Sequence, residues 1–128
     1  MRLCVGTSKG IVILDPDRVG APLMVLADPS SIWCMGQDCR EPNLIYAGAT
    51  QFTHMGASRG ATTFSRSTDA GRTWTDISPR TIREDDVWAV ATPPDGPNEV
   101  FIGTPRARLF RSVDRGRTFE EVTKQFEH

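Results

Sequence analysis

The first candidates for chemistry in this sequence are two aspartates that recur among the same neighbours. Residues 67–74 read Ser-Thr-Asp-Ala-Gly-Arg-Thr-Trp, and residues 112–119 read Ser-Val-Asp-Arg-Gly-Arg-Thr-Phe. The two segments lie 45 residues apart, agree at five of eight positions and both end in an aromatic residue. Each segment offers one carboxylate, Asp69 or Asp114, whereas a calcium loop needs about six to eight oxygen ligands. We therefore predict a structural role for both aspartates.

The composition of the repeated segment is that of a tight chain reversal. The carboxylates of Asp69 and Asp114 can accept hydrogen bonds from turn amides, and a nearby serine adds a second short hydrogen-bonding group. Gly71 and Gly116 supply the positive φ angle that a tight reversal requires. The terminal aromatic side chain fills the space beside the turn. The residues predicted to build the two turns are Ser67, Asp69, Gly71, Thr73, Trp74, Ser112, Asp114, Gly116, Thr118 and Phe119.

Other catalytic patterns are weakly represented. The two histidines, His54 and His128, occur without the neighbours of a zinc-protease helix, a nucleophile elbow or a cysteine–histidine pair. The adjacent Asp85 and Asp86 suggest an acid pair, but a solvated turn accounts for them more simply. The sequence has no phosphate-binding loop and no dinucleotide-binding motif. We therefore assign no catalytic residue, no metal and no cofactor.

The matches extend beyond the turns and divide the chain into repeated units. At an offset of 55 residues, Ile32-Trp33 matches Val87-Trp88, and residues 45–48 match residues 100–103. At an offset of 97, residues 3–7 match residues 100–104. The segments between glycines and prolines are short and rich in β-branched and aromatic residues, without a sustained helical period. We predict an all-β chain of four-stranded antiparallel meanders over residues 1–27, 31–78 and 86–123, the first of which lacks its first strand.

The repeats also predict which aromatic side chains pack inside. Trp33 and Trp88 open equivalent strands, and we expect them in the core in preference to forming a ligand-stacking pair. Tyr46 is the only tyrosine, and its equivalents in the other repeats are Cys4 and Phe101. That pattern indicates a packing position.

Four-stranded meanders that recur about every 40 to 50 residues are typical of β-propeller blades. The Ser-x-Asp-x-Gly-x-Thr-Trp pattern resembles the Asp-box of the BNR repeat, and residues 1–14 resemble the first blade of YVTN/BNR-like propellers, often labelled glycosyl hydrolases or sialidases. The resemblance covers essentially the whole chain. It implies a single partial β-propeller domain over residues 1–128, with about 2.75 blades.

The resemblance leaves two functions open. Sialidases in this group use a tyrosine nucleophile, three arginines and an N-terminal Arg-Ile-Pro type motif, and this sequence lacks that motif. The first function is a noncatalytic propeller module that binds a ligand or protein. The alternative is a fragment or remnant of a BNR-type glycoside hydrolase. Fold alone does not decide between them, because one fold hosts many activities.

A binding face is predicted from the way a meander alternates its connections. The Asp-box turns all emerge on one face, and the opposite face receives the segment 50–63, which is ten residues longer than its counterpart. Loops on a rigid scaffold commonly carry function. Arginines there suit a carboxylate or phosphate, so we expect a small anionic ligand, a glycan or a protein. The candidate residues are Phe52, His54, Arg59, Arg80, Arg83, Arg106 and Arg108.

Charge and cysteine content bear on partners and compartment. The 15 Lys and Arg residues balance 16 Asp and Glu residues, which argues against a nucleic-acid partner. No apolar stretch approaches the roughly 20 residues that span a bilayer, so no membrane partner is expected. The three cysteines, Cys4, Cys34 and Cys39, have no CxxC spacing. They fit reduced thiols in the cytoplasm better than disulfides.

The number of predicted strands also predicts an oligomer. Propellers close with about four to eight blades, and a chain with fewer leaves an apolar face uncovered at each end. We expect a homodimer with about six blades, or another oligomer that completes a ring. The C-terminal residues 123–128 of a partner are a candidate for the missing first strand.

Overall fold

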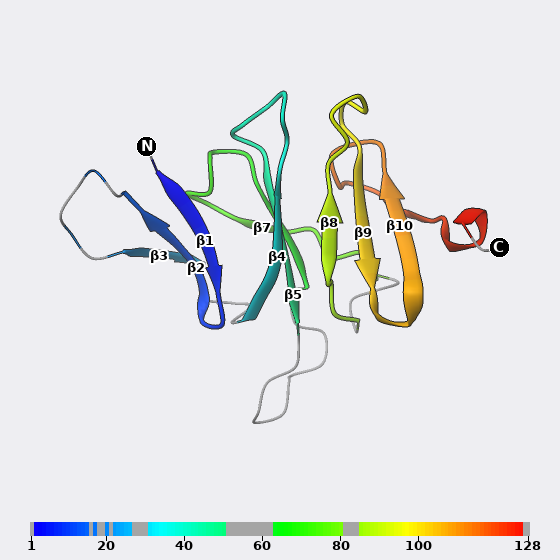
Figure 1. The fold of residues 1–128 in the computed structure, drawn as a ribbon, viewed down its shortest axis with the longest axis horizontal. Helices are drawn as coiled ribbons and strands as arrows, with labels where there is room; N and C mark the ends of the chain where they lie inside the picture. The colour runs from blue at the N-terminus through cyan, green and yellow to red at the C-terminus, as the bar shows by residue number, and fades with distance from the viewer. Residues whose placement is uncertain are drawn as a thin grey trace.

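The structure is a computed structural model that describes residues 2–15, 17, 20, 22–26, 31–50, 63–80 and 85–126, including the backbone but not the side chains of 125 and 126. These residues form three antiparallel sheets that lie side by side along the molecule (Figure 1). In the described part of the chain, no helix is long and apolar enough to cross a bilayer. The all-β prediction is therefore confirmed, and the regular elements besides strands are short 3-10 turns.

In each sheet the strands are neighbours in chain order, as in a meander. Sheet A holds β1 (Leu3–Thr7), β2 (Gly10–Leu14) and β3 (Leu23–Leu26). Sheet B holds β4 (Ser31–Gln37), β5 (Ile45–Thr50), β6 (Phe64–Ser67) and β7 (Thr75–Asp76). Sheet C holds β8 (Ala89–Ala91), β9 (Val100–Thr104), β10 (Arg108–Ser112) and β11 (Glu120–Glu121).

Two short 3-10 helices complete the described chain. The first, η2 (Pro105–Ala107), closes the hairpin between β9 and β10, and both Arg106 and Ala107 have positive φ angles there. The second, η3 (Thr123–Phe126), follows β11. Residues 123–128 are the segment that the sequence suggests as a strand for a partner chain. In the single chain this segment begins as a 3-10 helix, and its last two residues lie outside the described residues.

Apolar side chains fill the two spaces between neighbouring sheets. Between sheets A and B, a cluster forms around Ile11, Ile32, Ala47 and Ala49. Between sheets B and C, a larger cluster contains Leu44, Tyr46, Phe64, Val87, Val100, Ile102 and Phe110. Sheet B is thus covered on both faces, and its strand β5 is buried along its whole length. Burial of this kind is the main favourable term in folding.

Glycines set how closely the sheets approach each other. A Cβ atom added to Gly6 would lie 2.5 Å from Cγ2 of Ile32, and one added to Gly48 would lie 2.6 Å from Cγ1 of Val87. The third equivalent glycine, Gly103, would meet only the Cβ atom of Ala89, at 3.7 Å. At two sheet interfaces, a glycine therefore leaves room for a β-branched side chain of the next sheet. On the outer face of sheet C, no such side chain from the described residues occupies the space beside Gly103.

The core prediction for Trp33 and Trp88 is wrong. Their exposed fractions are 57% and 51%. The strand register passes from the pair Ile32–Ala49 directly to Cys34–Gly48, so Trp33 is the extra residue of a bulge. A bulge turns its extra side chain away from the regular alternation. Trp88 has a similar place. Gly103 is the strand partner of Ala89, and the backbone N–H of Trp88 also donates to the carbonyl of Gly103, so two consecutive residues lie opposite one residue of β9.

Replacing Gly48 with alanine should destabilise the protein by about 1–3 kcal/mol, since overpacked cores lose about that much. The new methyl group would meet Cys34 Sγ at 2.5 Å and the Val87 backbone oxygen at 3.0 Å. The repeat-equivalent Gly103→Ala is the matched control, and it should change stability by less than about 0.5 kcal/mol. Urea denaturation measures both. Equal losses for the two variants would contradict the assigned role of Gly48.

Candidate functional site

The carboxylates of the two repeated segments, residues 67–74 and 112–119, which we call the boxes, are bound by their own turns. In Asp69, Oδ1 accepts the N–H of Thr73 at 2.9 Å and the hydroxyl of Ser67 at 2.7 Å, and Oδ2 accepts the hydroxyl of Thr73. Asp114 repeats this arrangement with Thr118 and Ser112 at 2.9 and 2.7 Å. Each aspartate thus closes a short loop of its own chain, which is a structural role.

The serines and glycines of the boxes complete the reversal. The hydroxyl oxygen of Ser67 accepts the N–H of Gly71 at 2.8 Å, and Ser112 accepts that of Gly116 at the same distance. Gly71 and Gly116 have φ angles of +90° and +84°. Left-handed backbone at these positions favours glycine, because it has no Cβ atom to clash.

One feature of the turns was missed from the sequence. The residues before the glycines, Ala70 and Arg115, also have positive φ angles, of 62° and 60°. Their N–H groups donate to the carbonyls of Asn43 and Asn98 in the preceding hairpins, at 3.0 and 2.9 Å. The signal was present, because Pro42-Asn43 and Pro97-Asn98 recur at the same offset of 55 as the strands around them. These bonds tie each box to the other hairpin at that end of its sheet.

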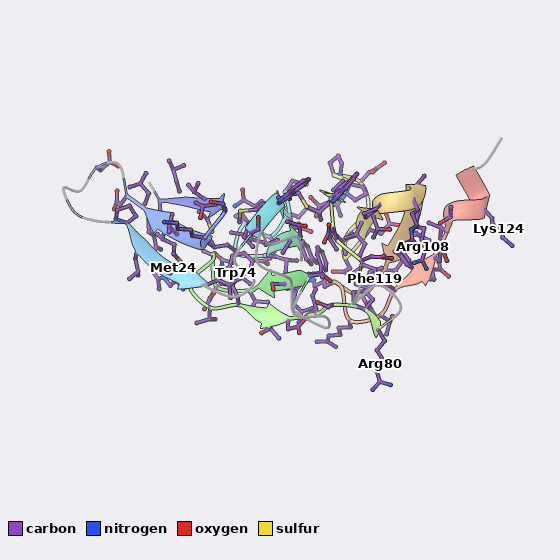
Figure 2. All side chains as sticks on the ribbon, turned by 90° about the horizontal axis from the view of Figure 1, so that it is seen from below. Met24, Trp74, Arg80, Arg108, Phe119 and Lys124 are labelled. Atoms are coloured by element: carbon purple, nitrogen blue, oxygen red, sulfur yellow. The ribbon has the colours of Figure 1, made fainter. Side chains whose placement is uncertain are left out.

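The aromatic residues that end the boxes pack toward the preceding sheet (Figure 2). Trp74 of sheet B joins the cluster between sheets A and B, and its indole N–H donates to the carbonyl of Gly71 at 2.8 Å. Phe119 of sheet C meets the ring of Phe64 edge to face, with 5.9 Å between centroids. The boxes are therefore part of the packing between sheets as well as turns.

Hydrogen bonding keeps the box carboxylates ionised far into acid. The bonds from Thr73 and Ser67 lower the pKa of Asp69 to about 2. The bonds from Thr118 and Ser112 likewise lower the pKa of Asp114 to about 2. A general acid requires a raised carboxyl pKa. The two aspartates have the opposite shift, which suits a carboxylate that only accepts hydrogen bonds.

Tyr46 has the surroundings of a core residue. Its exposed fraction is 1%, and its ring stacks on that of Phe64 with 5.7 Å between centroids. Burial raises the pKa of Tyr46 to about 12. A nucleophile needs contact with its substrate and an activating base, and this hydroxyl is enclosed between sheets B and C. The predicted packing position is confirmed.

The candidate residues of the loop face are only partly described. Phe52, His54, Arg59 and Arg83 lie outside the described residues. Arg80 and Arg106 are exposed, and Figure 2 shows the Arg80 side chain projecting away from the sheets.

Arg108 differs from these two arginines because its guanidinium is already bound. It pairs with Asp85 and with Glu121 at 2.9 Å each, and it lies 4.9 Å from the ring centroid of Phe110. The structure also accounts for Asp85, one of the adjacent aspartates considered as an acid pair. Its carboxylate is a partner of Arg108, 23 residues away.

A pair of exposed tryptophans lies at the same end of the sheets as the loop face. The rings of Trp33 and Trp88 stack with 5.9 Å between centroids and an interplanar angle of 20°. Trp33 is near the start of β4, where Ser31 faces Thr50 at the edge of the long segment. Trp88 bonds to Gly103, next to the hairpin that contains Arg106. The two indoles form a continuous aromatic surface on adjoining sheets.

A hollow lies between sheets B and C. It has a volume of about 410 Å³. Its lining includes three arginines, Arg66, Arg80 and Arg117, and the carboxylate residue Asp76. Arg66 is committed there, because its Nη1 donates to the carbonyl of Arg115 at 2.5 Å. That bond links sheet B to the box turn of sheet C, so the hollow is bordered by a packing contact.

No protein-family model matches this chain, and no curated protein matches it significantly. The resemblance of residues 1–128 to Asp-box propellers therefore remains an expectation.

The box carboxylates make stability depend on pH in the acid range. Because the pKa of each carboxyl is lower in the folded state, the unfolded chain binds protons first as the pH drops. The stabilisation that these two carboxylates provide is therefore complete above a pH of about 4 and falls away as the pH drops toward about 2. Asp69→Asn and Asp114→Asn should each flatten this fall. Thermal melts between pH 2 and 7 measure it. Asp95→Asn, which removes an exposed carboxylate outside both boxes, is the control. An unchanged fall in both box variants would contradict the assignment.

Proposed function

We propose that the chain is a noncatalytic binding module of the Asp-box β-propeller type, which holds a ligand or protein at the end of its sheets opposite the boxes. Three meanders in succession and two box turns with the same hydrogen bonds support the architecture. At the opposite end lie the stacked tryptophans, the exposed Arg106 and Thr50, the last residue of β5.

The exposed pair Trp33–Trp88 is the observation that carries this proposal. Large aromatic side chains that leave more than half of their surface in water lose the free energy of burial that the core residues gain. Exposed apolar patches commonly mark interaction sites, and tryptophan is among the residues enriched in binding hot spots. Two of them at equivalent positions of neighbouring sheets form a platform that suits the apolar face of a sugar ring.

The noncatalytic part of the proposal rests on what the candidate catalytic groups already contact. The carboxylates of Asp69 and Asp114 bind their own turns, Tyr46 is enclosed in the core, and Asp85 is paired with Arg108. Each of these four groups is engaged within the fold, which supports the noncatalytic proposal. The remnant of a glycoside hydrolase remains the alternative, and an activity measurement distinguishes the two.

Tryptophan fluorescence tests the binding site directly. We expect 3′-sialyllactose, lactose or a heparin-derived disaccharide to change the emission in a saturable way. Trp33→Ala and Trp88→Ala should each weaken that binding at least tenfold, or about 1.4 kcal/mol. Val113→Ala removes another exposed apolar side chain, on a box turn, and serves as the control. Unchanged affinity in both tryptophan variants would contradict the proposed site.

Turnover assays test the alternative. The wild-type protein should release no product from aryl glycosides or aryl sialosides, because the carboxylates of Asp69 and Asp114 bind their own turns and Tyr46 is enclosed in the core. Activity that disappears in Tyr46→Phe would overturn the noncatalytic proposal and favour a glycoside hydrolase. The purified Tyr46→Phe protein must keep a cooperative melt, since the ring stacks in the core.

A further inference from the structure

We propose that two copies of this chain pack head to tail, with sheet C of each copy against sheet A of the other. The surfaces that would meet are the two ends of the molecule, which are separate from the ligand site. The repeats make positions in the three sheets equivalent, so their burial can be compared. In sheet B these positions are covered on both faces, which shows what each face of such a sheet contacts.

The strands β1, β5 and β9 are equivalent in the three repeats. Alternate residues of each of these strands point to opposite faces of its sheet. In sheet B, Ala47 points to the cluster shared with sheet A, and Tyr46 points to the cluster shared with sheet C. We call these the preceding face and the following face. The residues of β1 and β9 equivalent to Ala47 are Val5 and Ile102, and those equivalent to Tyr46 are Cys4 and Phe101.

The preceding face of sheet A lacks its cover. Ala47 and Ile102 have exposed fractions of 1% and 0%, whereas Val5 has 38%. Leu3, also on this face, is exposed, although its equivalent Val100 is fully buried. Met24 lies beside them, because it faces Val12, which in turn faces Val5. This exposed apolar face lies at the free end of the molecule, where Figure 2 labels Met24.

The following face of sheet C lacks its cover in the same way. Gly6, Gly48 and Gly103 face Ile11, Phe64 and Leu109 on the next strand. Ile11 and Phe64 are fully buried under the following sheet, but Leu109 is only half-buried. Phe101 is likewise half-buried, whereas its equivalent Tyr46 is enclosed.

An arginine occupies equivalent positions on the following faces of sheets B and C, with Arg66 beside Tyr46 and Arg111 beside Phe101. In sheet B, Arg66 reaches across to the box turn of sheet C and donates to the carbonyl of Arg115. Its equivalent in sheet C, Arg111, turns back to Glu99 of its own sheet, with Nε 2.8 Å from Oε1. The guanidinium that links sheet B to sheet C at position 66 is thus bound within sheet C at position 111.

A second copy fits both uncovered faces, because each is the counterpart of the other. Inside the chain, a following face packs on a preceding face at both sheet interfaces, and a second copy supplies one of each. Two copies related by a twofold axis form two identical contacts and leave neither end open. The resulting six sheets lie within the range of about four to eight that closes a ring.

Light scattering and mixed variants test this arrangement. We expect the wild-type protein to have a mass near twice 14.1 kDa at micromolar concentration. Val5→Asp places a charge on the preceding face of sheet A, and Leu109→Asp places one on the following face of sheet C. Each variant alone should have a mass near 14.1 kDa, because both contacts of its dimer are damaged. Val113→Asp is the control on a box turn and should stay dimeric.

The decisive sample is an equimolar mixture of Val5→Asp and Leu109→Asp. A mixed dimer has one contact with both changes and one with neither, so the mixture should recover a mass near twice 14.1 kDa. Pairing of sheet A with sheet A would instead leave Leu109→Asp dimeric by itself, and that result would overturn the proposal.

A monomeric wild-type protein, or a mixture that stays monomeric, would also overturn it. Far-UV circular dichroism and a cooperative melt verify folding. If Val5→Asp fails to fold, Met24→Asp replaces it on the same face, and Ala91→Asp likewise replaces Leu109→Asp.

Discussion

The packing of one small sheet on the next is the contact on which this structure depends. Each sheet has only three or four short strands, and so few strands bury little surface without a neighbour. The two apolar clusters lie between sheets, and each combines side chains from both. Glycines at 6 and 48 bring the sheets close enough for a β-branched side chain to fill the space. Stability of this kind is shared between neighbouring repeats and grows with their number.

This constraint also explains where the polar chemistry of the chain goes. The box aspartates, their serines and threonines, and Arg66 all act in holding turns or joining one sheet to the next. Their hydrogen bonds let a tight turn present Trp74 or Phe119 to the space beside the preceding sheet. Residues that in isolation suggest acid–base chemistry are thereby part of the architecture.

The exposed surfaces differ in kind. At the two ends of the molecule, exposed apolar residues occupy positions that are buried in the middle sheet, so their exposure follows from the lack of a neighbouring sheet. Trp33 and Trp88 are different, because they are exposed even at the junction of two packed sheets. Comparison of equivalent positions therefore separates the surfaces that we propose for pairing from the one that we propose for ligand binding, which exposure alone does not do.

The sequence by itself determined the strands, their order and the two box turns. These depend on interactions between residues close in the chain, such as Asp69 with Thr73, and the repeat offsets mark them twice. Only the tertiary structure decided that Trp33 and Trp88 face solvent and that Arg108 is bound by Asp85. Bulges and ion pairs between distant segments depend on what lies across from a residue in space. A pattern of residue types along the chain contains no such information, and for that reason burial and pairing had to be read from the folded sheets.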